Sequence, residues 1–152
     1  MKKDSRAYII LYTVLITVIA GTLLGSASLG LKKFKDANEK LELQKSILGT
    51  FMELPKSTND IVDTYNKRVK TYVVNAQGDV VKGKEATSVN VGEQYSALRT
   101  NPRGRDLPIY EVRGEDGTGE VIYYVLPLYG FGLWDVIWAY VAIDAKDINT
   151  VK

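Results

Sequence analysis

Hydrophobic and polar positions divide the chain into an apolar amino-terminal segment and a mixed remainder. The 25 residues from Ala7 to Leu31 carry no formal charge and are mainly Ile, Leu, Val, Ala and Thr. A membrane-spanning helix needs about 20 such residues to cross ~30 Å of hydrocarbon. A cleavable signal peptide has an apolar core of roughly 7–15 residues, which is shorter than this segment. The pattern therefore predicts a transmembrane anchor over residues 1–31.

Basic residues flank the anchor equally on its two sides, with Lys2, Lys3 and Arg6 before it and Lys32, Lys33 and Lys35 after it. The positive-inside rule therefore gives no direction. Because the amino-terminal flank is too short to be a domain, we expect a single-pass protein whose amino terminus is cytoplasmic and whose remainder is exported.

Small residues recur every four positions along one face of the anchor, and the last two form a GxxxG pattern: Thr13, Thr17, Gly21 and Gly25. Small side chains let two helix backbones approach closely in lipid, where packing drives association. The alternative is that such residues are simply common in membrane helices. We expect these four positions to form a helix-packing face, whose partner the sequence does not identify.

Helical spacing continues beyond the anchor. Apolar residues at Phe34, Ala37, Leu41, Leu48 and Phe51 alternate with Lys and Glu, which predicts a juxtamembrane amphipathic helix over residues 32–56. Residues 57–60 offer helix-capping side chains, and a short helix follows with an apolar face made by Ile61, Val62, Tyr65 and Val69.

The carboxy-terminal part has the pattern of strands. Residues 71–74 and 80–81 flank a turn and predict a hairpin, whereas residues 82–105 are polar and are expected to be partly loop. Further strands are predicted over residues 109–113, 121–126 and 136–143, with a loop over residues 127–135. Apolar residues dominate these strands, so at least two should lie inside the sheet. Residues 57–152 are thus expected to form an α+β domain with an antiparallel or mixed sheet and flanking helices.

Composition excludes several kinds of chemistry. The chain of 152 residues has no cysteine and no histidine, so it has no disulfide, no thiolate nucleophile, no Ser-His-Asp triad and no Cys or His metal ligand. The net charge of +2 is too small to argue for nucleic acid. The acidic turn Glu115-Asp116-Gly117 with Glu120 lacks the spacing of a calcium loop, and a solvated hairpin turn is the preferred interpretation. We assign no catalytic residue and no metal ligand.

Three other patterns leave alternatives open. Arg99, Arg103 and Arg105 form a basic cluster that suits phosphate or lipid headgroups but equally an ordinary exposed loop. The segment Gly130-Phe131-Gly132 lacks the lysine of a P-loop. Eight of the 15 aromatic residues lie between Tyr110 and Tyr140, where they form either a sheet core or the wall of a site for a planar ligand.

Two stretches resemble a known family. Residues 8–15 and 19–24 are similar to the anchor of the C subunit of the sodium-translocating NADH:quinone reductase. Residues 107–110 and 125–142 resemble the start of the FMN-binding domain of that subunit, and the Leu-Tyr-Gly-x-Gly-Leu-Trp element over residues 128–134 is fairly specific to it. The G subunit of the ion-translocating ferredoxin:NAD reductase shares this architecture and is the alternative within the resemblance.

The resemblance implies a component of a redox complex in a bacterial inner membrane, where electrons pass from NADH through flavins and iron–sulfur centres to quinone and sodium is exported. Its partners would be the other membrane subunits and the lipid bilayer, and its FMN domain would lie on the periplasmic face. The reactive group would be FMN, which suits a chain without His or Cys. Gly132, Leu133 and Trp134 match the element that leads into the flavin domain, and the resemblance implies a cofactor-binding role for them.

The chain departs from the family in one respect. The family joins the FMN phosphate to a threonine of a Ser/Thr-Gly-Ala-Thr motif, which does not occur in these 152 residues. The chain thus resembles roughly the first two-thirds of such a protein, and we expect that alone it binds no FMN covalently and has no enzymatic activity. Two further functions stay open: a single-span exported binding or sensor domain with an aromatic pocket, and a structural assembly protein that uses the GxxxG face.

Overall fold

The computed structural model describes residues 6–152, which fold into two units, residues 6–40 and residues 41–152. The helices are α1 (Arg6–Leu48), α2 (Thr58–Arg68) and α3 (Val91–Thr100), with 3-10 turns η1 (Ala86–Ser88) and η2 (Pro102–Gly104). The strands are β1 (Val69–Asn75), β2 (Asp106–Arg113), β3 (Val121–Phe131) and β4 (Val136–Asp144). The expected α+β class with one long amino-terminal helix is confirmed.

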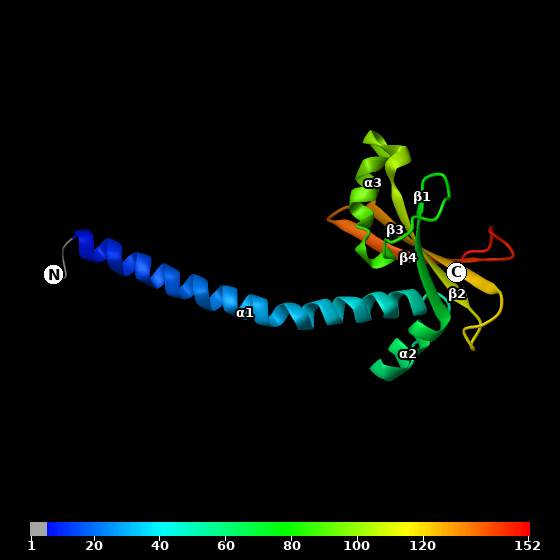
Figure 1. The fold of residues 1–152 in the computed structure, drawn as a ribbon, viewed down its shortest axis with the longest axis horizontal. Coiled ribbons are helices and arrows are strands. Elements are labelled where there is room, and N and C mark those ends of the chain that lie inside the picture. The colour runs from blue at the N-terminus through cyan, green and yellow to red at the C-terminus, as the bar shows by residue number, and fades with distance from the viewer. Residues whose placement is uncertain (1–5) are drawn as a thin grey trace. The chain divides into compact units, whose positions relative to one another are not determined.

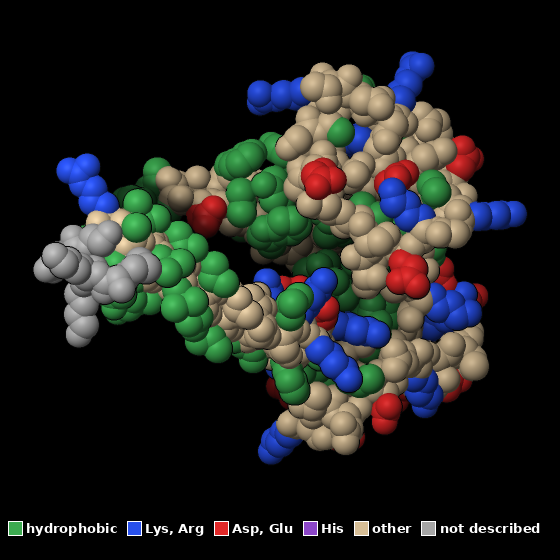
Figure 2. Space-filling view, turned by 60° about the vertical axis from the view of Figure 1, so that its left-hand side comes forward, with side chains coloured by type: hydrophobic (Ala, Val, Ile, Leu, Met, Phe, Trp, Pro, Cys, Tyr) green, Lys and Arg blue, Asp and Glu red, His purple; other side chains and the backbone are tan. Residues whose placement is uncertain are grey.

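The first unit consists of α1 up to Lys40. Its apolar side chains are exposed along the helix and gather into a continuous hydrophobic surface (Figure 2). Within residues 6–152, α1 is the one helix long and apolar enough to cross a membrane. The hydroxyls of Thr13 and Thr17 each donate to the carbonyl four residues earlier, at 2.9 Å, so neither leaves an unpaired polar group in an apolar environment.

The second unit is built on a four-stranded sheet in the order β1-β2-β3-β4, with every neighbouring pair antiparallel (Figure 1). Strands β2 and β3 are central, which confirms that at least two strands lie inside the sheet. The register aligns Thr71, Tyr110, Val125 and Ala142 in one row across the four strands. Because side chains alternate between the two faces, this row and its second neighbours point to the same side.

The core lies on that side of the sheet. Strand residues Val73, Val112 and Val125 are fully buried there, and Ile47 and Leu48 at the end of α1 pack into the same core cluster. Helix α2 adds its buried residues, and η1 adds Ala86. The opposite face is also apolar and borders a hollow of about 320 Å³ lined mainly by strand side chains: Tyr72, Val74, Ile109, Tyr124, Leu126 and Ile143.

Several element boundaries differ from the sequence expectation; Val69, for example, was expected on the face of the short helix and instead begins β1. The helix expected over residues 32–56 continues directly from the anchor and ends at Leu48, where the Gly49 N–H still donates to the Lys45 carbonyl at 2.8 Å. The hairpin expected at residues 71–81 has one regular strand, because Val80 joins Val74 only through an isolated bridge and β1 pairs with β2.

Two further segments were expected to be partly loop (residues 82–105) and loop (residues 127–135). Residues 82–105 include helix α3, and β3 continues through Pro127 to Phe131, which shortens the loop expected over residues 127–135. Pro127 is tolerated because β3 pairs with β2 only as far as Val125, so this part of β3 has one partner strand.

Candidate functional site

The β3–β4 hairpin ends in a tight loop that carries the three residues implied in cofactor binding. The Gly132 N–H donates to the Asp135 carbonyl at 2.9 Å and closes the turn. A Cβ atom at position 132 would lie 2.9 Å from Ile137 Cδ1 and 3.0 Å from the Asp135 carbonyl oxygen, so a larger residue would crowd the turn. The side chains of Leu133 and Trp134 are 90% and 94% exposed. The loop therefore presents an apolar pair to the surroundings.

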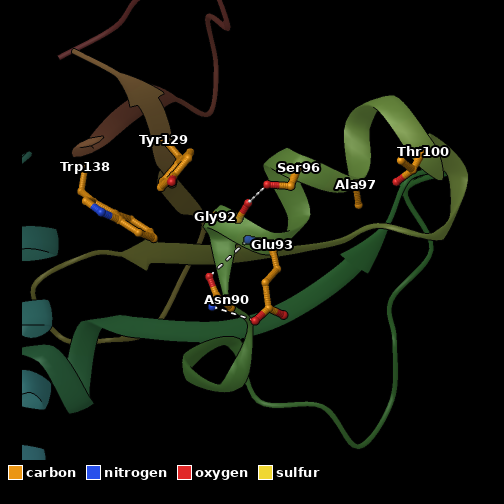
Figure 3. A pocket seen from close by; sticks show the side chains of 8 residues that line it. All are labelled: Asn90, Gly92, Glu93, Ser96, Ala97, Thr100, Tyr129 and Trp138. Atoms are coloured by element: carbon orange, nitrogen blue, oxygen red, sulfur yellow. Dashed lines mark hydrogen bonds between the residues drawn. The ribbon is translucent and has the colours of Figure 1, made fainter. Parts of the chain in front are cut away.

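A cleft of about 660 Å³ lies near the loop end of this hairpin, between the strands and α3. Tyr129 of β3 and Trp138 of β4 form its aromatic wall, and residues of α3 and its cap form the other side: Asn90, Gly92, Glu93, Ser96, Ala97 and Thr100 (Figure 3). Tyr129 and Trp138 are cross-strand partners in the register. Their ring centroids are 4.6 Å apart at an interplanar angle of 78°, the edge-to-face geometry that aromatic pairs favour.

Helix α3 is fixed at its start by a reciprocal cap. The Asn90 Oδ1 atom accepts from the Glu93 N–H at 3.3 Å, and the Asn90 amide donates to Glu93 Oε1 at 3.0 Å. Gly92 lets the helix approach the wall, because a Cβ there would lie 3.1 Å from the Tyr129 ring. Ser96 donates to the Gly92 carbonyl at 3.0 Å (Figure 3). The cleft thus faces a preformed helix turn with polar side chains.

The aromatic wall continues past the cleft. Tyr95 of α3 lies 5.3 Å from the Tyr129 ring centroid and 5.8 Å from that of Phe131. Tyr95 and Phe131 line a second hollow of about 290 Å³ together with Ser96 and Arg99. Of the three arginines considered from the sequence, Arg99 lies at this hollow, whereas Arg105 Nε donates to the Pro102 carbonyl at 3.1 Å within its own turn. Of the three arginines, Arg99 is thus the one that lines this hollow.

Beneath the cleft, a buried tyrosine cluster packs in the core. The ring centroids of Tyr110 and Tyr140 are 6.0 Å apart. Burial raises the pKa of Tyr65 to about 12 and also raises the pKa values of Tyr110 and Tyr140. These phenols are therefore neutral at physiological pH. Among the residues that line the cleft, Glu93 alone carries a formal charge.

The arrangement is suited to binding a flat, partly polar molecule rather than to acid–base or nucleophilic chemistry. Aromatic faces form one side of the cleft, and hydroxyl, amide and carboxylate groups form the other. Within residues 6–152, no group of three or more carboxylates is placed to hold a metal ion.

None of the sequence-predicted site residues lines the cleft. Gly132, Leu133 and Trp134 occupy the hairpin loop beyond Tyr129 and Trp138, and the four helix-packing residues of α1 belong to the other unit. Sequence reasoning missed the α3 side chains, because their segment was expected to be partly loop. The signal was present as Asn90 followed three residues later by Glu93, a capping pattern at a helix start.

Comparison with known proteins gives a consistent set of relatives, although no family model matches the chain. The chain is 30% identical to the C subunit of the Na(+)-translocating NADH-quinone reductase of Haemophilus ducreyi, over 99% of its own length and 62% of the relative's. The protein of the same name from Neisseria meningitidis serogroup A is also 30% identical, with the same two coverages. The chain therefore spans about three fifths of the length of the curated relatives it matches.

Two solved structures have a similar fold. Shewanella oneidensis NqrC superposes with a TM-score of 0.59 at 28% identity, covering 76% of this chain and 58% of that one. The C subunit of the Na(+)-translocating NADH-quinone reductase of Parabacteroides distasonis gives a TM-score of 0.60 at 24% identity, covering 76% and 52%. At 24% identity, the similarity to the Parabacteroides distasonis structure concerns the fold alone.

Proposed function

We propose that this chain, which is homologous along almost all of its residues to the C subunit of Na(+)-translocating NADH-quinone reductases, serves in a membrane redox complex of that kind. Its part is to carry electrons through FMN toward quinone, in a complex that couples this transfer to sodium export. The observation that carries the proposal is the match over 99% of the chain, which includes the apolar helix as well as the domain. The partners are the other membrane subunits of the complex.

The apolar part of α1 supports the placement of the protein. In this proposal residues 1–31 span a bacterial inner membrane once, residues 32–56 lead out of it, and residues 57–152 form part of an FMN-binding type of domain on the periplasmic face. Thr13, Thr17, Gly21 and Gly25 form the face that packs against a membrane helix of the complex. The apolar run is long enough for this role, and its most apolar stretch is not buried within the chain.

The residues around the β3–β4 hairpin fit an FMN group. The cleft of about 660 Å³ has the size of a cofactor site, and Tyr129 and Trp138 offer aromatic faces to a flat ring system. Ser96, Thr100 and Asn90 offer hydrogen-bonding groups across from them. The exposed Leu133 and Trp134, held by the glycine turn at Gly132, would cover the edge of a ring bound there. When bound, FMN supplies the one- and two-electron chemistry that these side chains lack.

Flavin binding by the purified full chain tests this assignment. We expect FMN added to the protein in detergent to lose fluorescence on binding, and Trp138→Ala and Trp134→Ala each to weaken the affinity by about tenfold, as the loss of one aromatic contact implies. Tyr12→Ala, which changes an aromatic residue of the anchor, is the matched control. An affinity that is the same in all four proteins would contradict the site.

A separate experiment tests whether the flavin is attached covalently. Because no Ser/Thr-Gly-Ala-Thr motif occurs in residues 1–152, we expect the 152-residue chain to release its flavin on denaturation. A fluorescent flavin band at the mass of the chain, after denaturing electrophoresis, would show a covalent bond and contradict this expectation.

A further inference from the structure

Three lysines follow the apolar segment of α1 within four residues: Lys32, Lys33 and Lys35, all exposed. An α-helix turns by about 100° per residue, because it has 3.6 residues per turn. Relative to Lys32, the side chain of Lys33 therefore leaves the helix about 100° further round and that of Lys35 about 300° round. The three ammonium groups surround the helix instead of lining one face, and we call them the lysine ring.

The depth of the lysine ring follows from the length of the apolar run. The residues from Ala7 to Leu31 extend roughly 37 Å along the helix, which exceeds the ~30 Å of hydrocarbon in a bilayer. With this run in the hydrocarbon, as the proposed function requires, the next residues lie in the headgroup layer. Phe34, 67% exposed, lies among the lysines in the sequence.

The positive charge of the lysine ring is only partly balanced within the helix. Lys35 Nζ lies 3.6 Å from Glu39 Oε1, and both side chains are exposed, so this pair is weak. In the described part of the chain, no ion pair within 4.0 Å involves Lys32 or Lys33. Asp36 is the one acidic residue among residues 32–36, which leaves this segment with a net charge of +2.

We propose that the lysine ring binds the phosphate groups of anionic phospholipids, such as phosphatidylglycerol, in the leaflet that adjoins the folded domain. An ammonium group donates three hydrogen bonds and attracts a phosphate without demanding a fixed geometry. Because the lysines point in several directions, a neighbouring membrane helix can cover one side of α1 while the others still face lipid. The inference rests on the membrane-spanning role of α1 in the proposed function.

Lipid retention by the full chain provides the test. The protein is placed in nanodiscs with equal amounts of phosphatidylcholine and phosphatidylglycerol, and native mass spectrometry measures which lipids it keeps on release. We expect at least about threefold enrichment of phosphatidylglycerol, because each lysine near an anionic surface contributes severalfold to binding. The variant K32Q/K33Q/K35Q should lose most of the enrichment, with a remainder from the basic residues before the anchor, whereas K32R/K33R/K35R should retain it in full.

A matched control removes the same charge elsewhere. K56Q/K82Q/K146Q changes three exposed lysines of the second unit and should leave the enrichment unchanged. Sodium phosphate and sodium chloride are also compared at equal ionic strength, and the two salts should reduce the enrichment equally. A stronger effect of phosphate would indicate a site for the free anion and overturn the lipid assignment. A chain that inserts into the bilayer without lipid preference overturns this inference alone. A chain that fails to insert overturns the proposed anchor as well.

Discussion

Gly132 shows how a single residue shapes the candidate site. A Cβ atom there would press on Ile137 and on the Asp135 carbonyl, whereas at Gly130, in the same hairpin, no neighbouring atom lies within 4 Å of the added Cβ. We expect Gly132→Ala to lower the free energy of unfolding by about 1 kcal/mol, as mild overpacking does. Gly130→Ala, the matched control, should change it by less than about 0.5 kcal/mol. Urea unfolding followed by tryptophan fluorescence measures both, and equal effects would contradict the geometry of the turn.

The buried side chain of Tyr65 makes the free energy of unfolding depend on pH. Its side chain is buried, with 8% of its surface exposed, and burial raises its pKa from the ordinary value near 10 to about 12. Below pH 10 the phenol is protonated in the folded and unfolded states alike, so its contribution to stability is complete. Between pH 10 and 12 the unfolded chain loses this proton while the folded chain keeps it, and the free energy of unfolding falls.

The fall should approach about 3 kcal/mol for this tyrosine, because its two pKa values differ by about two and each unit of pKa difference corresponds to about 1.4 kcal/mol. Tyr110 and Tyr140, whose pKa values are raised by burial too, change stability in the same direction. Tyr65→Phe should therefore reduce the loss of stability between pH 9 and 11.5 without abolishing it. An identical pH profile for Tyr65→Phe and wild type would refute the assignment.

At the scale of elements, α1 has two roles that change along its length. Its first part is apolar and exposed, whereas its last turn places Ile47 and Leu48 in the domain core with no exposed surface. We expect Ile47→Ala to lower the free energy of unfolding of the domain by roughly 2–5 kcal/mol, the usual cost of a cavity left by a buried isoleucine.

The matched control is Ile148→Ala, because Ile148 is 76% exposed and its truncation should cost less than about 0.5 kcal/mol. Thermal unfolding followed by circular dichroism in detergent compares the two. If Ile47→Ala were as stable as Ile148→Ala, the end of α1 would not be part of the core.

The elements also show which features the sequence reveals. Strands β2 and β3 were predicted, because a glycine-containing acidic turn separates two runs rich in Val, Ile and Tyr. Helix α3 was missed, since its residues are mostly polar and its Asn90–Glu93 cap is a short signal. The extension of β3 through Pro127 was also missed, because proline argues against a strand unless the local pairing is known.

The candidate site, too, was predicted only in part from the sequence. The sequence pointed to Gly132, Leu133 and Trp134 through a resemblance, and these residues do form the tip of a hairpin beside an aromatic cleft. It did not identify the α3 residues across the cleft, because that contact joins segments that are distant along the chain. The aromatic residues themselves serve both interpretations considered from composition: Tyr110 is in the core, and Tyr129 and Trp138 line the cleft.

At the scale of the whole molecule, one chain combines a long apolar helix with an α+β domain that carries an aromatic-walled cleft. Under the proposed function FMN would supply the reactivity, which accords with a sequence that has no Cys and no His. The apolar outer face of the sheet, opposite the core, adds a surface of the kind found at protein contacts. Both features accord with a protein that acts within an assembly, as the proposed function states.

Affinity purification of the tagged full chain from membranes of its own source organism tests this central claim most directly. The account predicts that the chain brings down other membrane subunits together with flavin, and that the preparation oxidises NADH with a quinone acceptor at a rate raised by sodium ions. A chain that purifies without other membrane subunits, from membranes that retain such activity after its depletion, would contradict the account.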